Sequence, residues 1–173
     1  QRVLIPKEWV RDPGRAVDIV MQWHAIPGDF RATFPNVEIS VGDDRWILRQ
    51  SFGDPKTAPT RREIKFDDRV QPGVWTAWVI HAKWSPKDDG LLQVWKDGKL
   101  VADLKGPNTY GTIGLEYTPY LKTGIYHPEW NVAKPGARER FEAEKPAAPH
   151  KVVYVTDLKV GDERARYEDV APR

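Results

Sequence analysis

Residues 91–104 read LLQVWKDGKLVADL, and this stretch decides the fold class. Its centre, Asp97-Gly98, lies between two strand-like runs, Gln93–Lys96 and Lys99–Val101. Asp and Gly both tolerate the positive φ angles that a two-residue type I′ turn requires. The stretch therefore predicts a tight β-hairpin.

Seven more segments have strand-like sequences, and turn clusters such as Asp88–Gly90 and Gly42–Asp44 separate several of them. These segments are residues 17–25, 37–41, 46–52, 62–66, 74–84, 120–126 and 151–160. No long segment keeps a helical period of apolar residues. The sequence therefore predicts an all-β protein: a concanavalin-like jelly-roll sandwich of two antiparallel sheets, forming a single domain over residues 1–173.

Composition excludes several classes of protein. A length of 173 residues with 40% hydrophobic side chains is enough for one buried core. The net charge of +2 gives no argument for nucleic-acid binding, and no apolar run is long enough to span a membrane. The absence of cysteine excludes disulfides, and no signal peptide is visible. Eight tryptophans are expected to serve mostly as core packing units, Trp95 among them.

Residues 120–126, YLKTGIY, form a strand with an unusually polar face. Successive strand residues point to opposite sides, so Tyr120, Lys122 and Tyr126 share one face. Gly124 lies between the last two on that face and leaves a position without a side chain. Such a face is either the floor of a site for an anionic substrate or an ordinary solvent-facing strand side.

A second polar pair lies on the predicted strand 17–25. Gln22 and His24 are two residues apart and therefore project from the same face. An amide can hold a carboxylate, and a histidine can move protons near neutral pH. A hydrogen-bonded edge pair without chemical consequence is the alternative interpretation.

Other candidate contacts are weaker. Arg49 can grip a carboxylate through its planar fork, although surface arginines are common. His81 and Lys83 share one face of the strand 74–84 and either line a groove or face solvent. No carboxylate falls on the polar faces identified above. A glycoside hydrolase, which needs a pair of carboxylates, is therefore disfavoured.

The sequence gives little indication of a metal. The four histidines lack the spacing of zinc ligands, and there is no cysteine to assist them. The acidic turns Asp88-Asp89 and Asp43-Asp44 are the places where a structural Ca²⁺ is possible, although no EF-hand pattern is present.

Taken together, these segments resemble the polysaccharide lyases of jelly-roll fold. The resemblance is to the bacterial family grouped with heparin lyase I and glucuronan lyase, and more distantly to jelly-roll alginate lyases. Its order and spacing cover most of the chain. The segments that carry it are Ile5–Trp9, Gln22–His24, His81–Pro86, Asp89–Trp95 with Asp97–Lys99, Gly106–Tyr110, Tyr120–Tyr126 and Val153–Leu158.

The resemblance implies β-elimination on a polysaccharide that contains uronic acid. It implies that Gln22 neutralises the substrate carboxylate, that His24 and Tyr126 transfer protons, and that Lys122 contacts a substrate carboxylate. The expected substrate-binding residues are Arg49, His81, Lys83, Tyr120 and Lys122. No cofactor is required for this chemistry, and the expected location is secreted or periplasmic.

The sequence also departs from the family pattern in one respect. Members carry an arginine-bearing strand well before the Gln-x-His strand, whereas only residues 1–21 precede Gln22 here. An N-terminal strand region of the family is therefore expected to be lacking. Two rival functions remain: a non-catalytic carbohydrate-binding jelly roll, and a protein-interaction domain of a larger assembly.

Overall fold

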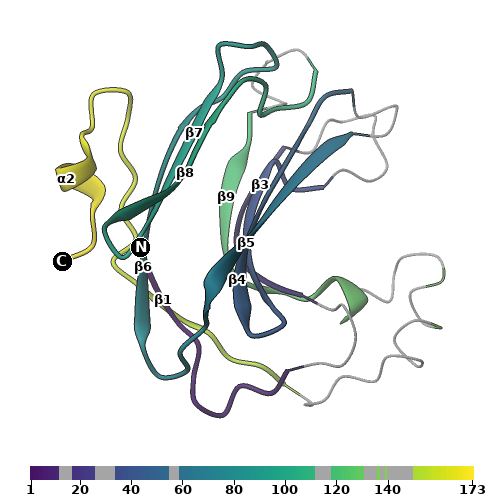
Figure 1. Ribbon diagram of the computed structural model, residues 1–173, viewed down its shortest axis with the longest axis vertical. Helices are drawn as coiled ribbons and strands as arrows, with labels where there is room; N and C mark the ends of the chain where they lie inside the picture. Colours follow the sequence, from purple (N-terminus) through teal and green to yellow (C-terminus); the bar gives the residue numbers. More distant parts are fainter. Residues whose placement is uncertain are drawn as a thin grey trace.

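The computed structural model describes residues 1–11, 17–25, 34–54, 59–111, 118–130, 136, 139 and 150–173. Within these ranges the chain forms two five-stranded sheets that stack face to face (Figure 1). Every strand pair in both sheets is antiparallel. The expected all-β sandwich of jelly-roll type is confirmed.

The first sheet has the strand order β10-β1-β6-β7-β8, and the second has the order β5-β4-β3-β2-β9. The strands of the first sheet are β1 (Arg2–Leu4), β6 (Trp75–Lys83), β7 (Leu91–Lys96), β8 (Lys99–Lys105) and β10 (Tyr154–Thr156). Those of the second are β2 (Asp18–His24), β3 (Val37–Gly42), β4 (Arg45–Phe52), β5 (Thr60–Arg69) and β9 (Tyr120–Tyr126).

The predicted hairpin is confirmed as β7–β8. Asp97 and Gly98 have φ angles of 50° and 80°, so both adopt the left-handed conformation of a type I′ turn. The turn at Asp43-Asp44 joins β3 to β4 in the same way, with φ angles of 53° and 57°. Asp97 also accepts a hydrogen bond from the Ala77 amide at 2.8 Å, which ties the hairpin turn to β6.

The two ends of the chain differ from the expected pattern. The predicted strand 151–160 is wrong in extent, because β10 covers only Tyr154–Thr156 and Asp157 then takes a φ angle of 54° that ends it. The three-residue strand β1 was not expected, since it is too short to show alternation. It nevertheless joins β10 to β6.

Two short helices complete the described elements. A 3₁₀ turn, η2 (Pro128–Trp130), follows β9, and α2 (Tyr167–Val170) lies against the outer side of the first sheet (Figure 1). No helix among the described residues is long and apolar enough to span a membrane.

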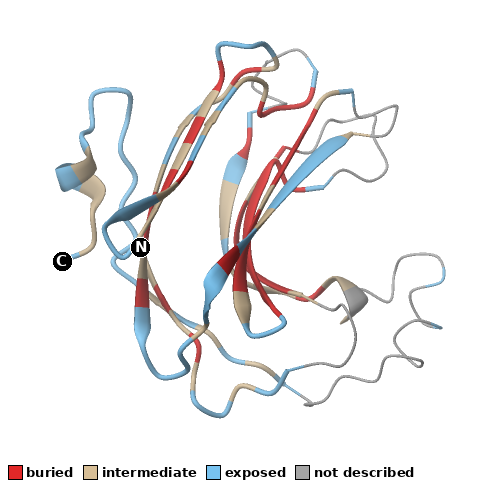
Figure 2. Cartoon of the chain, in the orientation of Figure 1, coloured by how far each residue is buried: buried red, intermediate tan, exposed pale blue. Residues whose placement is uncertain are grey.

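The core lies between the sheets, and two tryptophans meet at its centre. The rings of Trp46 on β4 and Trp78 on β6 are 5.3 Å apart and nearly perpendicular at 72°. Each is only 1% exposed, and burial of such a side chain contributes roughly 2–3 kcal/mol. Figure 2 shows buried residues running along the strands of both sheets.

The expectation that most tryptophans pack in the core is confirmed. Five of the eight lie in the core or against it: Trp9, Trp23, Trp46, Trp78 and Trp84. The prediction that Trp95 packs in the core is wrong, however, because its ring lies 5.3 Å from that of Tyr167 on α2. Leu92 and Val94 supply the core side of β7, so Trp95 covers its outer side.

The register of the second sheet is irregular around Val20. From Ile19 to Met21, β2 takes two steps while β3 takes one, from Ser40 to Ile39. Over the same interval β9 takes three steps, from Tyr126 to Thr123. Such β-bulges re-aim side chains and are common next to active sites.

Candidate functional site

The predicted site strands are neighbours in the second sheet. Gln22 on β2 is registered opposite Lys122 on β9, and His24 is opposite Tyr120. Beyond the bulge, Tyr126 is opposite Ile19. The structure therefore brings the three predicted catalytic residues onto two adjacent strands.

All of these side chains belong to one face of the sheet. The apolar residues Val37, Ile39 and Val41 of β3 point into the core, which leaves Glu38 and Ser40 on the opposite side. Gln22 is registered with Glu38, and Ile19 with Ser40. We call this side, turned away from the first sheet, the front face; it carries Gln22, His24, Glu38, Arg49, Tyr120, Lys122 and Tyr126.

His24 and Lys122 contact each other on the front face. The Lys122 ammonium nitrogen is 3.4 Å from Nδ1 of His24 and 4.9 Å from the centre of the Tyr120 ring. An ammonium group can only donate, so Nδ1 is the acceptor and the His24 proton is on Nε2. This tautomer presents an N–H donor on the other side of the ring.

A row of alternating charges crosses the front face beside Gln22. Arg49 donates to Glu38 at 2.9 Å and to Glu63 at 2.6 Å. Burial acts to lower the pKa of Arg49, but its hydrogen bonds to the two carboxylates outweigh burial and raise the pKa above its ordinary value. Burial acts to raise the pKa of Glu63, and the bond from Arg49 reverses this effect and lowers it. Arg49 therefore holds Glu63 in its charged form.

Glu38 and Glu63 correct one sequence-based inference. Carboxylates were expected to be absent from the polar faces, yet Glu38 lies directly opposite Gln22. Its side chain is 2% exposed and also contacts Arg61, with 3.3 Å between Nη2 and Oε1. A carboxylate this enclosed by arginines does not serve as the acid or the nucleophile of a glycoside hydrolase. The pairing of Glu38 with Arg49 and Arg61 therefore still disfavours a glycoside hydrolase.

The structure does not bring His81 and Lys83 to the front face. Both lie on β6, on the outer side of the first sheet, which we call the back face. His81 contacts Gln93 at 3.1 Å, and Lys83 donates to Asp89 at 2.9 Å. They line a hollow of about 730 Å³ along the edge of β6, together with residues 158–163.

A buried ionic cluster fixes the ends of the two site strands. Asp18, the first residue of β2, accepts hydrogen bonds from His127, which follows β9, and from Lys151, each at 2.7 Å. The three side chains are at most 6% exposed. Hydrogen bonds to a carboxylate buried to this degree are costly to break, so they set the position of β2 relative to β9.

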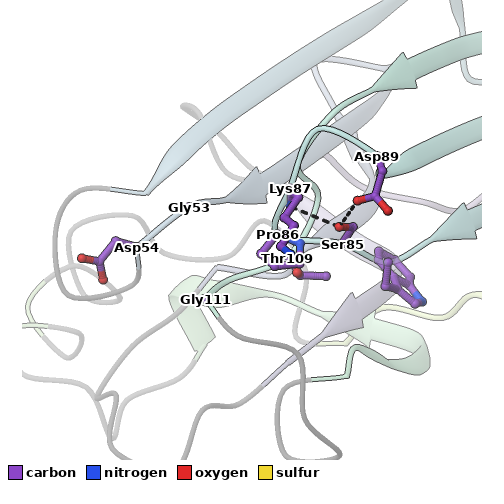
Figure 3. A pocket seen from close by; sticks show the side chains of 9 residues that line it. Gly53, Asp54, Ser85, Pro86, Lys87, Asp89, Thr109 and Gly111 are labelled. Atoms are coloured by element: carbon purple, nitrogen blue, oxygen red, sulfur yellow. Dashed lines mark hydrogen bonds between the residues drawn. The ribbon is translucent and has the colours of Figure 1, made fainter.

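A second hollow, of about 720 Å³, lies beyond the end of β4 (Figure 3). Asp89 there accepts a hydrogen bond from the Ser85 hydroxyl at 2.5 Å, and Ser85 in turn accepts one from the Lys87 amide at 3.1 Å. The bonds from Ser85 and Lys83 lower the pKa of Asp89 to about 2. None of the predicted site residues lines this hollow.

Three carboxylates of the acidic turns contact neighbouring side chains. Asp89 is engaged by Ser85 and Lys83, and Asp43 and Asp44 are paired with Arg11. Among the described residues, no group of three or more histidines or carboxylates is arranged to hold a metal ion.

Comparisons with known proteins identify the family and the fold. A family model described as polysaccharide lyase matches residues 2–159. The crystal structure of an endo-β-1,4-glucuronan lyase from the fungus Trichoderma reesei is similar, with a TM-score of 0.60 and 20% sequence identity. The similarity covers 75% of this chain and 56% of that chain, so this chain spans little more than half of that enzyme's length. At this identity the likeness shows the fold. No curated protein matched the chain.

Proposed function

We propose, from the premise that this chain belongs to the polysaccharide lyase family, that it cleaves a uronic-acid-containing polysaccharide by β-elimination. One observation carries the proposal. An amide, an imidazole and a phenol, those of Gln22, His24 and Tyr126, stand on one face of two adjacent strands. These are the groups that the reaction needs.

The reaction breaks two bonds of the uronate on the reducing-end side of the cleavage point, and the sugar on the other side leaves with the glycosidic oxygen. The C5–H bond yields its proton to a base, its electron pair forms the C4–C5 double bond, and the C4–O bond breaks. The leaving oxygen takes up a proton. The C5 proton is removable only when the neighbouring carboxylate is neutralised by fixed donors, because charge develops on that group in the transition state.

In this proposal each residue has one role. The Gln22 amide donates to the substrate carboxylate, and its position opposite buried Glu38 supports a fixed geometry. Tyr126 carries the proton from C5 to the leaving oxygen, and His24 assists by donating a hydrogen bond from its Nε2–H to that oxygen. Lys122 contributes positive charge beside Gln22, and Tyr120 supports Lys122 through its ring.

The substrate class follows from the charge of the front face and from the similar structure. The named substrate of that fungal enzyme, glucuronan, is the first polymer that we propose for this chain. Polymers of this kind lie outside the cell. We therefore propose a secreted or periplasmic protein, with the acidic polysaccharide as its partner.

A product assay tests the proposal. The protein is incubated separately with glucuronan, alginate, heparin and hyaluronan while ultraviolet absorbance of the unsaturated uronate product is recorded. We expect absorbance to rise with at least one polymer and the products to carry an unsaturated non-reducing end by mass spectrometry. A folded protein that binds a polymer without producing this signal would instead be a carbohydrate-binding domain.

A further inference from the structure

The buried carboxylate of Glu38 is held by two arginines that are not equivalent. Arg49 and Arg61 both contact the same oxygen, Oε1, at 2.9 Å and 3.3 Å. A buried charge needs compensation, and one hydrogen-bonded arginine supplies the matching unit of charge. Lys65 also lies 3.7 Å from Glu63, so Lys65, Arg49 and Arg61 set three positive charges against the two carboxylates of Glu38 and Glu63, and one positive charge is left over.

Arg49 is the enclosed member of the pair. It lies between Glu38 and Glu63, and its side chain is 14% exposed. Two carboxylates neutralise it from both sides, so it has little positive charge to offer a ligand. Arg49 is better understood as the residue that keeps Glu38 in place.

Arg61 is the accessible member. Its side chain is 35% exposed, and its contact with Glu38 is the longer of the two. Its guanidinium carbon lies 4.3 Å from the centre of the Phe34 ring. Stacking on an aromatic ring orients the planar fork of a guanidinium while its N–H groups remain able to bind a carboxylate.

The location of Arg61 relates it to the proposed catalytic residues. Its side chain starts on β5 and reaches across β4 to Glu38 on β3. Glu38 is registered opposite Gln22, and neighbouring strands are about 4.8 Å apart. Lys122 lies opposite Gln22 on the other side. Across the strands, Gln22 therefore has Lys122 next to it on one side and Glu38 next to it on the other, with Arg61 on the far side of Glu38.

We propose that Arg61, presented by Glu38 and Phe34, forms a subsite for the carboxylate of a uronate unit next to the one held at Gln22. The inference rests on the proposed function and deepens it. The polymer lies across the strands, and Arg61 binds an anionic unit that does not itself react. Arg49 is a positioning residue for this subsite.

The chain offers a matched control on the same strand. Arg62 lies next to Arg61 but points to the opposite side of β5, where it contacts Gln50 at 3.5 Å and the Phe52 ring at 4.9 Å. Arg61→Ala and Arg62→Ala remove the same charge from adjacent positions. Arg61→Lys keeps the charge and removes the planar fork.

Steady-state kinetics on glucuronan are the first measurement. We expect Arg61→Ala to raise KM about tenfold, because a charge-assisted hydrogen bond to the polymer is lost. Its kcat should remain close to that of the unaltered protein. The KM of Arg61→Lys should lie between that of Arg61→Ala and that of the unaltered protein, and the KM of Arg62→Ala should equal that of the unaltered protein. Melting temperatures of all variants check that the fold is intact.

Retention of the same proteins in glucuronan-containing native gels, at low and high salt, is the second measurement. Weaker retention of Arg61→Ala than of Arg62→Ala supports the subsite, even if no polymer is cleaved and the lyase proposal fails. Equal retention and equal KM for the two variants overturn the subsite while leaving the lyase proposal standing. A loss of kcat without a change in KM also overturns it, since that result places Arg61 in the chemical step.

Discussion

The front and back faces of this sandwich carry similar residue types in very different surroundings. On the front face Gln22 and Glu38 are 7% and 1% exposed. On the back face His81 is exposed, and its partner Gln93 is half-buried. Alternation along a strand places a side chain on a face, but it does not tell whether solvent reaches that face.

Burial changes what the polar groups do. Back-face contacts are pairs, such as Lys83 with Asp89, that water can replace at little cost. Front-face contacts extend from Glu63 through Arg49 to Glu38, over three adjacent strands. Buried polar groups must be paired, so this arrangement is held in one geometry, which is what a catalytic face requires.

Replacing the front-face phenol should give the largest contrast between the faces. We expect Tyr126→Phe to reduce kcat on the cleaved polymer about a thousandfold, because proton transfer by a positioned side chain contributes about this much. Tyr154→Phe, on the back face, should leave kcat unchanged. Melting temperature should be the same for both variants. Retention of most activity by Tyr126→Phe would remove this residue from the mechanism.

The buried carboxylate offers the next contrast, in stability. Glu38→Ala leaves Arg49 and Arg61 without their shared partner, and we expect a loss of about 3 kcal/mol in the free energy of unfolding. Asp89→Ala, which removes an exposed carboxylate, should cost only a small fraction of this loss. Urea denaturation at neutral pH compares the two. Similar stability of both variants would show that the front-face charges are solvated.

Replacing one glutamine on each face then compares how much the two faces contribute to catalysis. Gln22→Ala should lower kcat/KM about a hundredfold, the usual cost of removing one donor to a developing negative charge. Gln93→Ala on the back face is the control and should have no effect. If both variants keep full activity, the carboxylate must be neutralised by another group, and Arg61 becomes the first candidate.

The smallest expected effect concerns Tyr110 and the stability of the fold at alkaline pH. Burial raises the pKa of Tyr110 to about 12, and its hydroxyl donates to the Phe34 carbonyl at 2.8 Å. The folded pKa is above the ordinary value near 10. The neutral Tyr110 phenol therefore makes its full contribution to the free energy of unfolding below about pH 10, and this contribution is lost as pH rises toward about 12.

This prediction is checked by urea unfolding at about pH 9 and pH 11. Between these values the unaltered protein should lose about 1.4 kcal/mol more than Tyr110→Phe, which has no hydroxyl to titrate. Parallel losses in the two proteins would contradict a buried, neutral phenol at this position.

The parts of the molecule that sequence predicted are those fixed by local chemistry. Asp97-Gly98 gave the β7–β8 hairpin because its turn depends on two residues. The shared face of Gln22 and His24 followed from strand geometry alone. The family resemblance implied a common site for Gln22, His24 and Tyr126, but only the structure shows that β2 and β9, about a hundred residues apart in the chain, lie side by side.

The parts that sequence missed depend on which strands become neighbours. Glu38 alternates with Val37 and Ile39, so its outward orientation was readable, but its position beside Gln22 was not. His81 and Lys83 alternate just as well and belong to the other sheet. Only long-range pairing distinguishes these cases.

The stretched register near Val20 limits how the length of this protein can vary. Over one interval of the sheet, β3 takes one step, β2 takes two and β9 takes three. Side-chain direction reverses with each residue of a strand, so inserting or deleting one residue moves every following side chain to the other face of the sheet. Deleting Gly124 alone would shift the frame and carry Tyr126 to the core side. We therefore expect functional relatives to differ here by pairs of residues, and single deletions to be found only in proteins that no longer use this tyrosine.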